Sequence, residues 1–444
     1  MISSIQGTLS AYVSGQAFSG LAWPLPPPAV RPWLEAWRHW RVALTVAREG
    51  TAAAAGRTLY LSPSAVGRSL DHLERELGVP LFERSSRGAV PTAAADLLLP
   101  RIAQAFAQIE LAEQELRQWQ AGDGSRQSRL TGLGFRPWQV FLAVAAAGGE
   151  AGAAALLGIS QPAISQALQR LQHQAGVPLF EPRRRAPRIS EPGEALLRRA
   201  KLAWSEFRLA AEDWASRHGA LTGRLVVGTL PLSSGGLVPQ AIDRLLARHP
   251  EASVTVVDGT YETLLRQLCH AEVDVIVGAL RIPAPVPDVC QEPLFEDRLQ
   301  IVARSCYPAI AAAPRGLAEL RHASWIVPLA GTPWRAAFER AFVAEGLAPP
   351  ADGLSANSGA VIRALLLETD RLALISPSLV RRELEQGTLR RVDVAVRDTA
   401  RTIGIARRAQ QPSAVMAAWL GILRELVDQP RSVGEYKQNA TPGE

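Results

Sequence analysis

The hexapeptide GVPLFE occurs twice in this chain, at Gly78–Glu83 and at Gly176–Glu181, 98 residues apart. When the sequence is shifted against itself by 98 residues, the match extends without a gap in both directions. It begins at Trp40, which falls on Trp138, and continues through the leucines that follow the hexapeptide. A match of this extent indicates a duplicated folding unit, so the chain must build the same unit twice.

Each copy has the apolar pattern of three helices with a tight turn before the third. In the second copy, residues 137–192, we expect helices over Trp138–Ala146, 151–157 and Gln161–Gln174. Gly158 permits a sharp turn, and Ser160 stands at the position of an N-cap. This layout predicts a helix-turn-helix unit, whose third helix presents its N-terminal residues to the major groove of DNA.

The first copy, residues 31–95, follows the same plan, with Ser62 as the expected cap and Pro63 at the first helical position. In both copies a glycine should end the third helix, and the Leu-Phe pair of the hexapeptide should begin a wing. Basic segments follow, ERSSRG in the first copy and EPRRRAPR in the second. The wing arginines placed near phosphates or a minor groove are Arg84, Arg87, Arg183, Arg184, Arg185 and Arg188. A solvated basic loop is the alternative for RRRAPR.

The charge distribution also favours a polyanionic partner for the first half. Residues 1–201 hold 22 Lys and Arg against 15 Asp and Glu, a net +7, and the remainder carries −1 of the total of +6. Three scattered cysteines suit a reducing cytoplasm, with inert thiols favoured over a redox sensor. The first thirty residues contain no Lys or Arg, which argues against a secretory signal, and no apolar run is long enough to span a bilayer. We therefore expect a cytoplasmic protein without membrane association.

The segment SQPAISQALQRLQHQAGVPLFEPRRR resembles the recognition helix and wing of the LysR-type transcriptional regulators, and SPSAVGRSLDHLERELGVPLFERSSRGAVPT is similar to them as well. The resemblance extends roughly from Trp33 to Val427. The departure from the family pattern is the second DNA-binding unit, because the family ordinarily has one per chain.

The resemblance implies base and phosphate contacts at the start of each third helix. In the second copy they fall on Ser160, Gln161, Pro162, Ser165, Gln166 and Gln169. In the first copy they fall on Ser62, Pro63, Ser64 and Arg68, with Gly67 and Asp71 at the remaining matching positions. Glutamine can form a bidentate pair with adenine, whereas Arg68 would contact guanine or phosphate. We expect the first copy to be a working but less specific DNA reader; a structural relic is the alternative.

A long amphipathic helix is predicted after each copy, over 96–120 and 193–218. In the family this linker helix pairs antiparallel with its counterpart in a second chain. The connector AGDGSRQSRLTGLGFR, at 121–136, is Gly- and Ser-rich and long enough for both helices of one chain to pair. We therefore hypothesise a pseudo-dimer within one chain that binds an asymmetric operator.

From Leu221 the pattern changes to β-branched strands alternating with amphipathic helices. The expected strands are LVVGT, VTVVD, VDVIVGAL, LQIVAR, SWIVPL and RLALIS. This alternation predicts parallel sheets with crossover helices. The part of the chain from Leu221 onward resembles the family's effector domain, a two-lobed α/β module similar to periplasmic solute-binding proteins. The resemblance implies one lobe from 221–303 and 379–427, a second lobe from 304–378, and an effector such as a sugar or an aromatic acid.

Candidate effector contacts lie where strands end and helices begin, at the carboxyl edge of such sheets. They are Thr229, Ser233, Ser234, Thr332, Arg335 and Ser358. Simple N-capping is the alternative role for the hydroxyl groups. We expect no cofactor or metal besides the effector.

The expected architecture is multidomain: two winged helix-turn-helix domains, mainly α-helical, with linker helices, followed by the two-lobed α/β periplasmic-binding-protein-like domain. Its segments are a lead-in at 1–30, the first copy with its linker and connector, the second copy with its linker, the effector domain at 221–430 and a tail at 431–444. The expected function is sequence-specific regulation of transcription, modulated by a small molecule. Expected partners are double-stranded DNA, the effector, further copies of the chain and RNA polymerase.

Three other functions compete with this interpretation. A DNA-binding repressor without ligand response and a solute-binding protein would share parts of the pattern. An enzyme is disfavoured, because the chain has no GxSxG, HExxH, Walker-type loop or paired metal-ligand motif.

Overall fold

The chain divides into two compact units, Met1–Trp214 and Ala215–Glu444, each described separately below. The computed structural model describes residues 30–85, 88–120, 130–181, 188–217, 221–230, 236–281, 283–284, 286–308, 310, 314–350 and 353–428.

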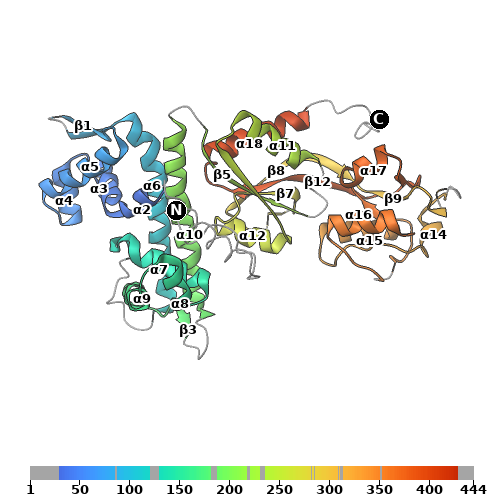
Figure 1. The fold of residues 1–444 in the computed structure, drawn as a ribbon, viewed down its shortest axis with the longest axis horizontal. Coiled ribbons are helices and arrows are strands. Elements are labelled where there is room, and N and C mark those ends of the chain that lie inside the picture. Colours follow the sequence, from blue (N-terminus) through green and yellow to red (C-terminus); the bar gives the residue numbers. More distant parts are fainter. Residues whose placement is uncertain are drawn as a thin grey trace, which may run out of the picture. The chain divides into compact units, whose positions relative to one another are not determined.

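The first copy of the repeat is a three-helix unit with a two-stranded wing, preceded by a short helix (Figure 1). Its elements are α2 (Arg31–Glu35), α3 (Trp37–Glu49), α4 (Ala52–Leu59), α5 (Pro63–Leu77), β1 (Phe82–Ser85) and β2 (Gly88–Pro91). The hydroxyl groups of Thr51 and Ser62 cap α4 and α5, as expected for Ser62. Gly78, with φ 72°, ends α5 in the left-handed conformation that glycine adopts without strain.

The second copy repeats this plan. Its elements are α7 (Phe135–Ala147), α8 (Glu150–Leu157), α9 (Gln161–Ala175), β3 (Phe180–Glu181) and β4 (Arg188–Ile189). The first helix begins three residues before its predicted start, and the third begins where it was predicted. The equivalent tryptophans Trp40 and Trp138 are almost fully buried in a single hydrophobic core that contains both copies.

The same hydrogen bonds anchor the wing in both copies. Oε1 of Glu74 on α5 and Oε1 of Gln172 on α9 each accept the backbone N–H of the leucine in the repeated hexapeptide, both at 2.9 Å. The hydroxyl groups of Thr92 and Ser190 donate to the proline carbonyl of that hexapeptide, at 2.8 and 2.7 Å. The hexapeptide is therefore the joint between the third helix and the wing.

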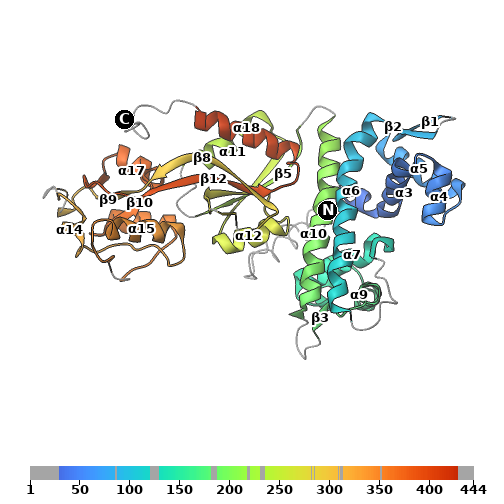
Figure 2. The same cartoon turned by 180° about the vertical axis from the view of Figure 1, so that it is seen from behind.

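Two long helices, α6 (Ala93–Leu116) and α10 (Glu191–Ser216), lie side by side in the first unit (Figures 1 and 2). Arg101 near the start of α6 pairs with Asp213 near the end of α10, at 3.1 Å from Nε to Oδ2. Arg199 near the start of α10 pairs with Glu115 near the end of α6, at 3.1 Å from Nε to Oε1. The two helices are therefore antiparallel partners within one chain.

The start of the second copy lies beside α6. After the one-turn helix η1 (Arg117–Trp119), the described chain resumes at η2 (Leu130–Gly132). The backbone N–H of Thr131 donates to Glu113 of α6 at 3.0 Å, and Arg41 of α3 donates to the Thr131 carbonyl at 3.1 Å. These bonds fix where the second copy begins.

The second unit contains two lobes. Lobe one has a five-stranded sheet in the order β6-β5-β7-β12-β8, with α11 and α18 packed together on one face and α12 on the other (Figure 1). Its elements are β5 (Gly223–Thr229), α11 (Leu237–Arg248), β6 (Ala252–Asp258), α12 (Tyr261–Cys269), β7 (Val275–Ala279), β8 (Val289–Arg298), β12 (Ala400–Arg408) and α18 (Ala414–Asp428).

Lobe two has a three-stranded sheet in the order β10-β9-β11 and a separate hydrophobic core. Trp325 lies edge-on to Phe338 and Phe342 in that core, with ring centroids 5.6 and 5.4 Å apart. Its elements are β9 (Gln300–Arg304), α14 (Leu317–Leu320), α15 (Pro333–Val343), α16 (Gly359–Glu368), β10 (Ala373–Ile375), η3 (Pro377–Val380), α17 (Arg381–Glu385) and β11 (Leu389–Arg391).

Three expectations for this half need correction. The sheets are not simply parallel: β5 is parallel to β6 and β7, but β12 is antiparallel to β7 and β8, and β9 is antiparallel to both neighbours. The strand expected at SWIVPL forms only two isolated bridges. Lobe two also extends beyond 304–378, because β9 and β11 pack their apolar residues into its core. The crossings between lobes therefore follow β8 and precede β12.

Among the described residues, no single helix has the length and apolar character needed to cross a membrane. The bent pair α7 and α8, with 117° between its helices, meets that test only as a pair and only by length and composition.

Candidate nucleic-acid interface

The recognition helix of the second copy, α9, buries one face and exposes the other. Ile164, Leu168 and Leu171 are buried in the core. The opposite face begins at the helix N-terminus and exposes four of the side chains predicted to contact DNA. They are Gln161, Pro162, Gln166 and Gln169. Amide groups that are exposed at this end of the helix have the donors and acceptors needed for base edges.

Two serines of α9 differ from expectation in their bonding. Ser160 holds the N-cap position, but its exposed side chain makes no capping hydrogen bond. Ser165 donates to the carboxylate of Glu150, the first residue of α8. The Ser165 hydroxyl is therefore directed to a neighbouring helix, a contact that the sequence pattern did not reveal.

The recognition helix of the first copy, α5, presents different chemistry. The hydroxyl group of Ser62 accepts the Ala65 N–H at 3.2 Å and lies 3.0 Å from the Ser64 hydroxyl. Pro63 and Arg68 are exposed on the same end of the helix. The pair Glu150 and Ser165 of the second copy has no counterpart, because Ala52 and Gly67 occupy the equivalent positions.

The wing arginines are only partly within the described structure. Arg84 lies on β1, in register with Ala89 of β2, and its side chain is outside the description. Arg188 is exposed on β4, in register with Glu181 of β3. Arg87, Arg183, Arg184 and Arg185 lie outside the described residues. Their roles remain predictions from the sequence.

The antiparallel helix pair places the two recognition helices within one unit. The first copy packs on the N-terminal part of α6, and the second copy packs on the N-terminal part of α10, so they are near opposite ends of the pair (Figures 1 and 2). The aromatic centre of the pair joins both copies, since Trp37 of α3 stacks on Phe207 of α10, with ring centroids 5.2 Å apart.

The contacts across the pair obey a pseudo-two-fold relation. Adding 98 to Arg101, Gln108 and Glu115 gives Arg199, Glu206 and Asp213. Arg101 pairs with Glu206 as well as Asp213, and Arg199 bonds Gln108 as well as Glu115. A surface that contacts its own equivalent is the signature of a two-fold dimer interface, here formed by one polypeptide.

The ion pair at Glu115 affects its proton affinity. Burial raises the pKa of the Glu115 carboxyl, but the hydrogen bond and charge of Arg199, with a further contribution from Arg198, outweigh that effect. The net result is a pKa below the ordinary value for glutamate. The carboxylate is therefore held in its charged form by the helix pair.

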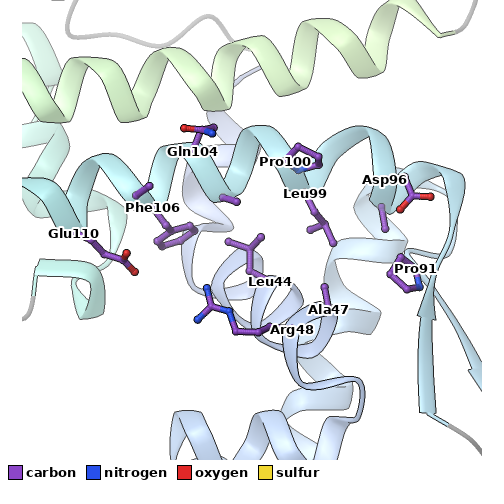
Figure 3. A pocket seen from close by; sticks show the side chains of 13 residues that line it. Leu44, Ala47, Arg48, Pro91, Asp96, Leu99, Pro100, Gln104, Phe106 and Glu110 are labelled. Carbon is purple, nitrogen blue, oxygen red and sulfur yellow. The ribbon is translucent and has the colours of Figure 1, made fainter. Parts of the chain in front are cut away.

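An open pocket of about 570 Å³ lies between α3 and α6, bordered by the wing strand β2 (Figure 3). Its lining combines the apolar side chains of Leu44, Leu99 and Phe106 with the charged groups of Arg48 and Glu110. None of the residues predicted to contact DNA lines this pocket.

The described residues predicted to contact an effector bond within their own lobes. Thr229, at the end of β5, is fully buried and donates to Asp258 at the end of β6. Thr332 and Ser358 cap α15 and α16, as the alternative interpretation proposed. Arg335 donates to Glu339 at 2.6 Å and to a backbone carbonyl at 3.2 Å. Ser233 and Ser234 lie outside the described residues.

One buried polar cluster joins the two lobes. The Ser376 hydroxyl, directly after β10 in lobe two, donates to Asp297 of β8 at 2.8 Å. Arg401 of β12 bonds the same carboxylate at 2.7 Å. Asp297 and Ser376 are each 1% exposed, and Arg401 has 7% of its side chain exposed. The cluster therefore ties lobe two to both strands that connect the lobes, and sequence reasoning did not identify it.

Comparison with known families agrees with this division of the chain. Residues 37–96 and 135–194 both match the bacterial regulatory helix-turn-helix protein family of LysR type. Residues 218–428 match the LysR substrate binding domain. The helix-turn-helix family thus matches each copy of the repeat separately.

Two curated regulators illustrate the range of similarity. The transcriptional regulator GalR of Pseudomonas putida is 32% identical over 393 residues, which is 88% of this chain and 96% of GalR. The transcriptional regulator PcaQ of Agrobacterium fabrum is 30% identical over 311 residues, which is 70% of this chain and 98% of PcaQ. A match of 393 residues is too long to fit after residue 134, so the similarity to GalR extends into the first copy.

Solved structures support the same fold. The LysR family transcriptional regulator CbnR superposes with a TM-score of 0.51 at 20% identity, over 66% of this chain and 99% of CbnR. A full-length, singly substituted OxyR from Pseudomonas aeruginosa gives a TM-score of 0.51 at 22% identity, over 66% of this chain and 94% of that one.

Proposed function

We propose that this chain, which belongs to the LysR family of DNA-binding transcriptional regulators, binds one asymmetric operator with both of its helix-turn-helix copies. The chain is a regulator with an effector-binding domain and not an enzyme. The observation that carries the proposal is the isologous pairing of α6 and α10 within one polypeptide. One chain therefore has the two readers that a symmetric regulator obtains by dimerisation.

The two recognition helices are the reason to expect an asymmetric operator. A homodimer presents one sequence to both half-sites and so favours palindromes. Here α9 exposes Gln161 and Gln166, which suit adenine, whereas α5 exposes Arg68, which suits guanine or phosphate. We infer that the second copy supplies more of the base preference and the first copy supplies more of the backbone contact.

The effector is proposed to be a small organic molecule such as a sugar or an aromatic acid, bound between the lobes of the second unit. Thr229, Ser233, Ser234, Thr332, Arg335 and Ser358 stay candidates for its contacts. A movement of lobe two that changed the Ser376 contact with Asp297 would give the open and closed forms different free energies. An effector that favours one form then shifts DNA binding or activation.

Further copies of the chain and RNA polymerase are proposed as protein partners, in the cytoplasm where the DNA lies. The pseudo-dimer makes oligomerisation unnecessary for occupying two half-sites, so any association would link separate pseudo-dimers.

Selection of bound DNA from a random pool, with wild type, Gln161→Ala and Arg68→Ala, tests this function. Two unlike half-sites are expected, each altered by a different one of the two substitutions. Analytical ultracentrifugation of the full chain on the selected DNA should show one chain per operator, and footprinting of the same complex should show both half-sites protected. A palindrome that responds to only one of the substitutions would overturn the proposal.

A further inference from the structure

Tyr60 occupies a left-handed backbone position in the turn before recognition helix α5. Its φ and ψ are 57° and 40°, and the equivalent Gly158 of the second copy has 65° and 35°. Both residues close the end of the second helix of their unit. Glycine adopts this conformation without penalty, whereas a bulky L-residue is strained there. The first copy therefore has a strained tyrosine at a position that glycine occupies in the second copy.

A second exchange affects the same turn. A Cβ atom on Gly56 would lie 2.5 Å from the Leu61 carbonyl oxygen, so only glycine permits this close approach. The second copy has Ala154 at the equivalent position. The bond that closes the turn is 2.8 Å from the Leu61 N–H to the Gly56 carbonyl, and 3.1 Å at the equivalent site. In the first copy the glycine of this turn is therefore Gly56, inside α4, and the left-handed position carries the Tyr60 side chain.

The Tyr60 side chain does not pack against the rest of the fold. It is 96% exposed, more than the other exposed large apolar side chains in the described part of the chain, of which Val343 at 64% is next. Burial of its ring therefore does not compensate for the strain. Strained backbone positions cluster at sites that contact ligands, so Tyr60 is a candidate for a contact outside the chain.

The residues around Tyr60 indicate that its partner outside the chain is DNA. It lies two residues before the cap of α5, between exposed Arg57 on α4 and exposed Ser62, Ser64 and Arg68. In a helix-turn-helix unit this end of the recognition helix enters the major groove, and the preceding helix crosses the sugar–phosphate backbone. Here that preceding helix is α4, and Tyr60 is its C-terminal cap. Tyrosine hydroxyl groups are among the donors that bond phosphate oxygens there.

We propose that the Tyr60 hydroxyl donates a hydrogen bond to a DNA phosphate beside the half-site contacted by the first copy. The inference rests on the proposed DNA-binding function and adds a contact residue outside the recognition helix. Gly158 cannot make such a contact, so the first copy holds the DNA backbone at a point where the second copy does not. This compensates for the glutamines that α5 lacks.

The test compares the full-length Tyr60→Phe and Tyr60→Asn variants with wild type on the selected operator. Asparagine tolerates the left-handed conformation, so Tyr60→Asn should unfold at the same or a higher denaturant concentration. Both variants should bind the operator about tenfold more weakly, as expected for loss of a hydrogen bond to a charged group. Gly158→Asn, the matched exchange in the second copy, should retain wild-type affinity.

Salt dependence separates this contact from a cationic one. A neutral hydroxyl releases no counterion, so the Tyr60 variants should keep the wild-type slope of log K against log salt. Arg68→Ala should reduce that slope by about 1 if the guanidinium contacts a phosphate.

Three results would overturn the inference. If both Tyr60 variants bind with wild-type affinity, Tyr60 does not contact DNA. If only Tyr60→Phe binds with wild-type affinity, the contact is not a hydrogen bond from the hydroxyl group. Unchanged DNA affinity with reduced transcription by RNA polymerase assigns Tyr60 to a protein partner instead. If Gln161→Ala and Arg68→Ala also leave DNA affinity unchanged, the proposed function is wrong. If those two substitutions weaken DNA binding, only the role of Tyr60 is wrong.

Discussion

The two helix-turn-helix copies share the contacts that hold the wing and the contacts that cross the α6–α10 pair. They differ in the exposed residues of their recognition helices. Glu74 and Gln172 hold the wing through the same bond, and Arg101 and Arg199 cross the helix pair in the same way. The exposed ends of α5 and α9 share few side chains beyond the serine at the N-cap position. A homodimer must use one sequence for both readers. Two copies in one chain can differ in every exposed residue while their shared interface keeps its chemistry.

The interface itself carries a smaller asymmetry. Arg101 faces two carboxylates, Glu206 and Asp213, whereas Arg199 faces the carboxylate of Glu115 and the neutral amide of Gln108. The first group is also more deeply buried, because the side chains of Arg101 and Glu206 are 7% and 1% exposed and that of Glu115 is 26% exposed. The two halves of the pseudo-dimer should therefore respond unequally to the same substitution.

The largest expected effect is the loss of Arg101. Replacing it with Met leaves the charge of Glu206 buried without this guanidinium, which should destabilise the helix pair by about 3–5 kcal/mol. The equivalent Arg199→Met should cost about 1–2 kcal/mol, because its partners are better exposed or neutral. Hydrogen–deuterium exchange of α6 and α10 in the full chain measures both. Equal costs would show that the two halves are energetically symmetric.

The next effect concerns base preference. Gln161→Ala should lose about 1–3 kcal/mol of discrimination at one position of one half-site. Arg68→Ala should change the other half-site and leave the first intact. Competition binding with single-base operator variants measures each change, and Arg298→Ala, an exposed arginine of lobe one, is the control. A change in both half-sites from either substitution alone would mean that the two copies do not bind separate sites.

The sequence predicted the helices of both copies well, because the repeat aligned each glycine, cap and apolar face with its equivalent. It also predicted the separate second unit with its alternation of strands and helices. It did not reveal β12, which is bordered by arginines, or the antiparallel partners of β9, because strand direction depends on contacts distant in sequence. For the same reason the cluster of Ser376, Asp297 and Arg401 could not be foreseen. Those three residues meet only after the lobes have folded.

A smaller effect tests why the first copy contains two glycines in its helices. Gly67→Ala should stabilise the protein by about 0.5–1 kcal/mol, since glycine is costly within a helix and an added Cβ meets nothing within 4 Å. Gly56→Ala should destabilise it, because its Cβ would contact the Leu61 carbonyl at 2.5 Å. Thermal unfolding of the two variants measures the difference. Stabilisation by both would show that the turn before α5 relaxes freely.

The smallest effect is the pH dependence of the helix pair. The pKa of Glu115 is lowered in the folded chain, so its contribution to stability is fully present above the unfolded value of about 4.3 and is lost as the pH falls through the folded value. Since Glu115 is partly exposed, we expect a loss below about 1 kcal/mol between roughly pH 6 and pH 3. Arg199→Met should reduce this dependence, whereas Arg298→Met, which removes the partner of exposed Glu296, should not. Urea unfolding at both pH values measures the difference between the variants. An unchanged pH dependence in Arg199→Met would mean that this half of the pseudo-dimer depends on its aromatic contacts and not on its ion pair.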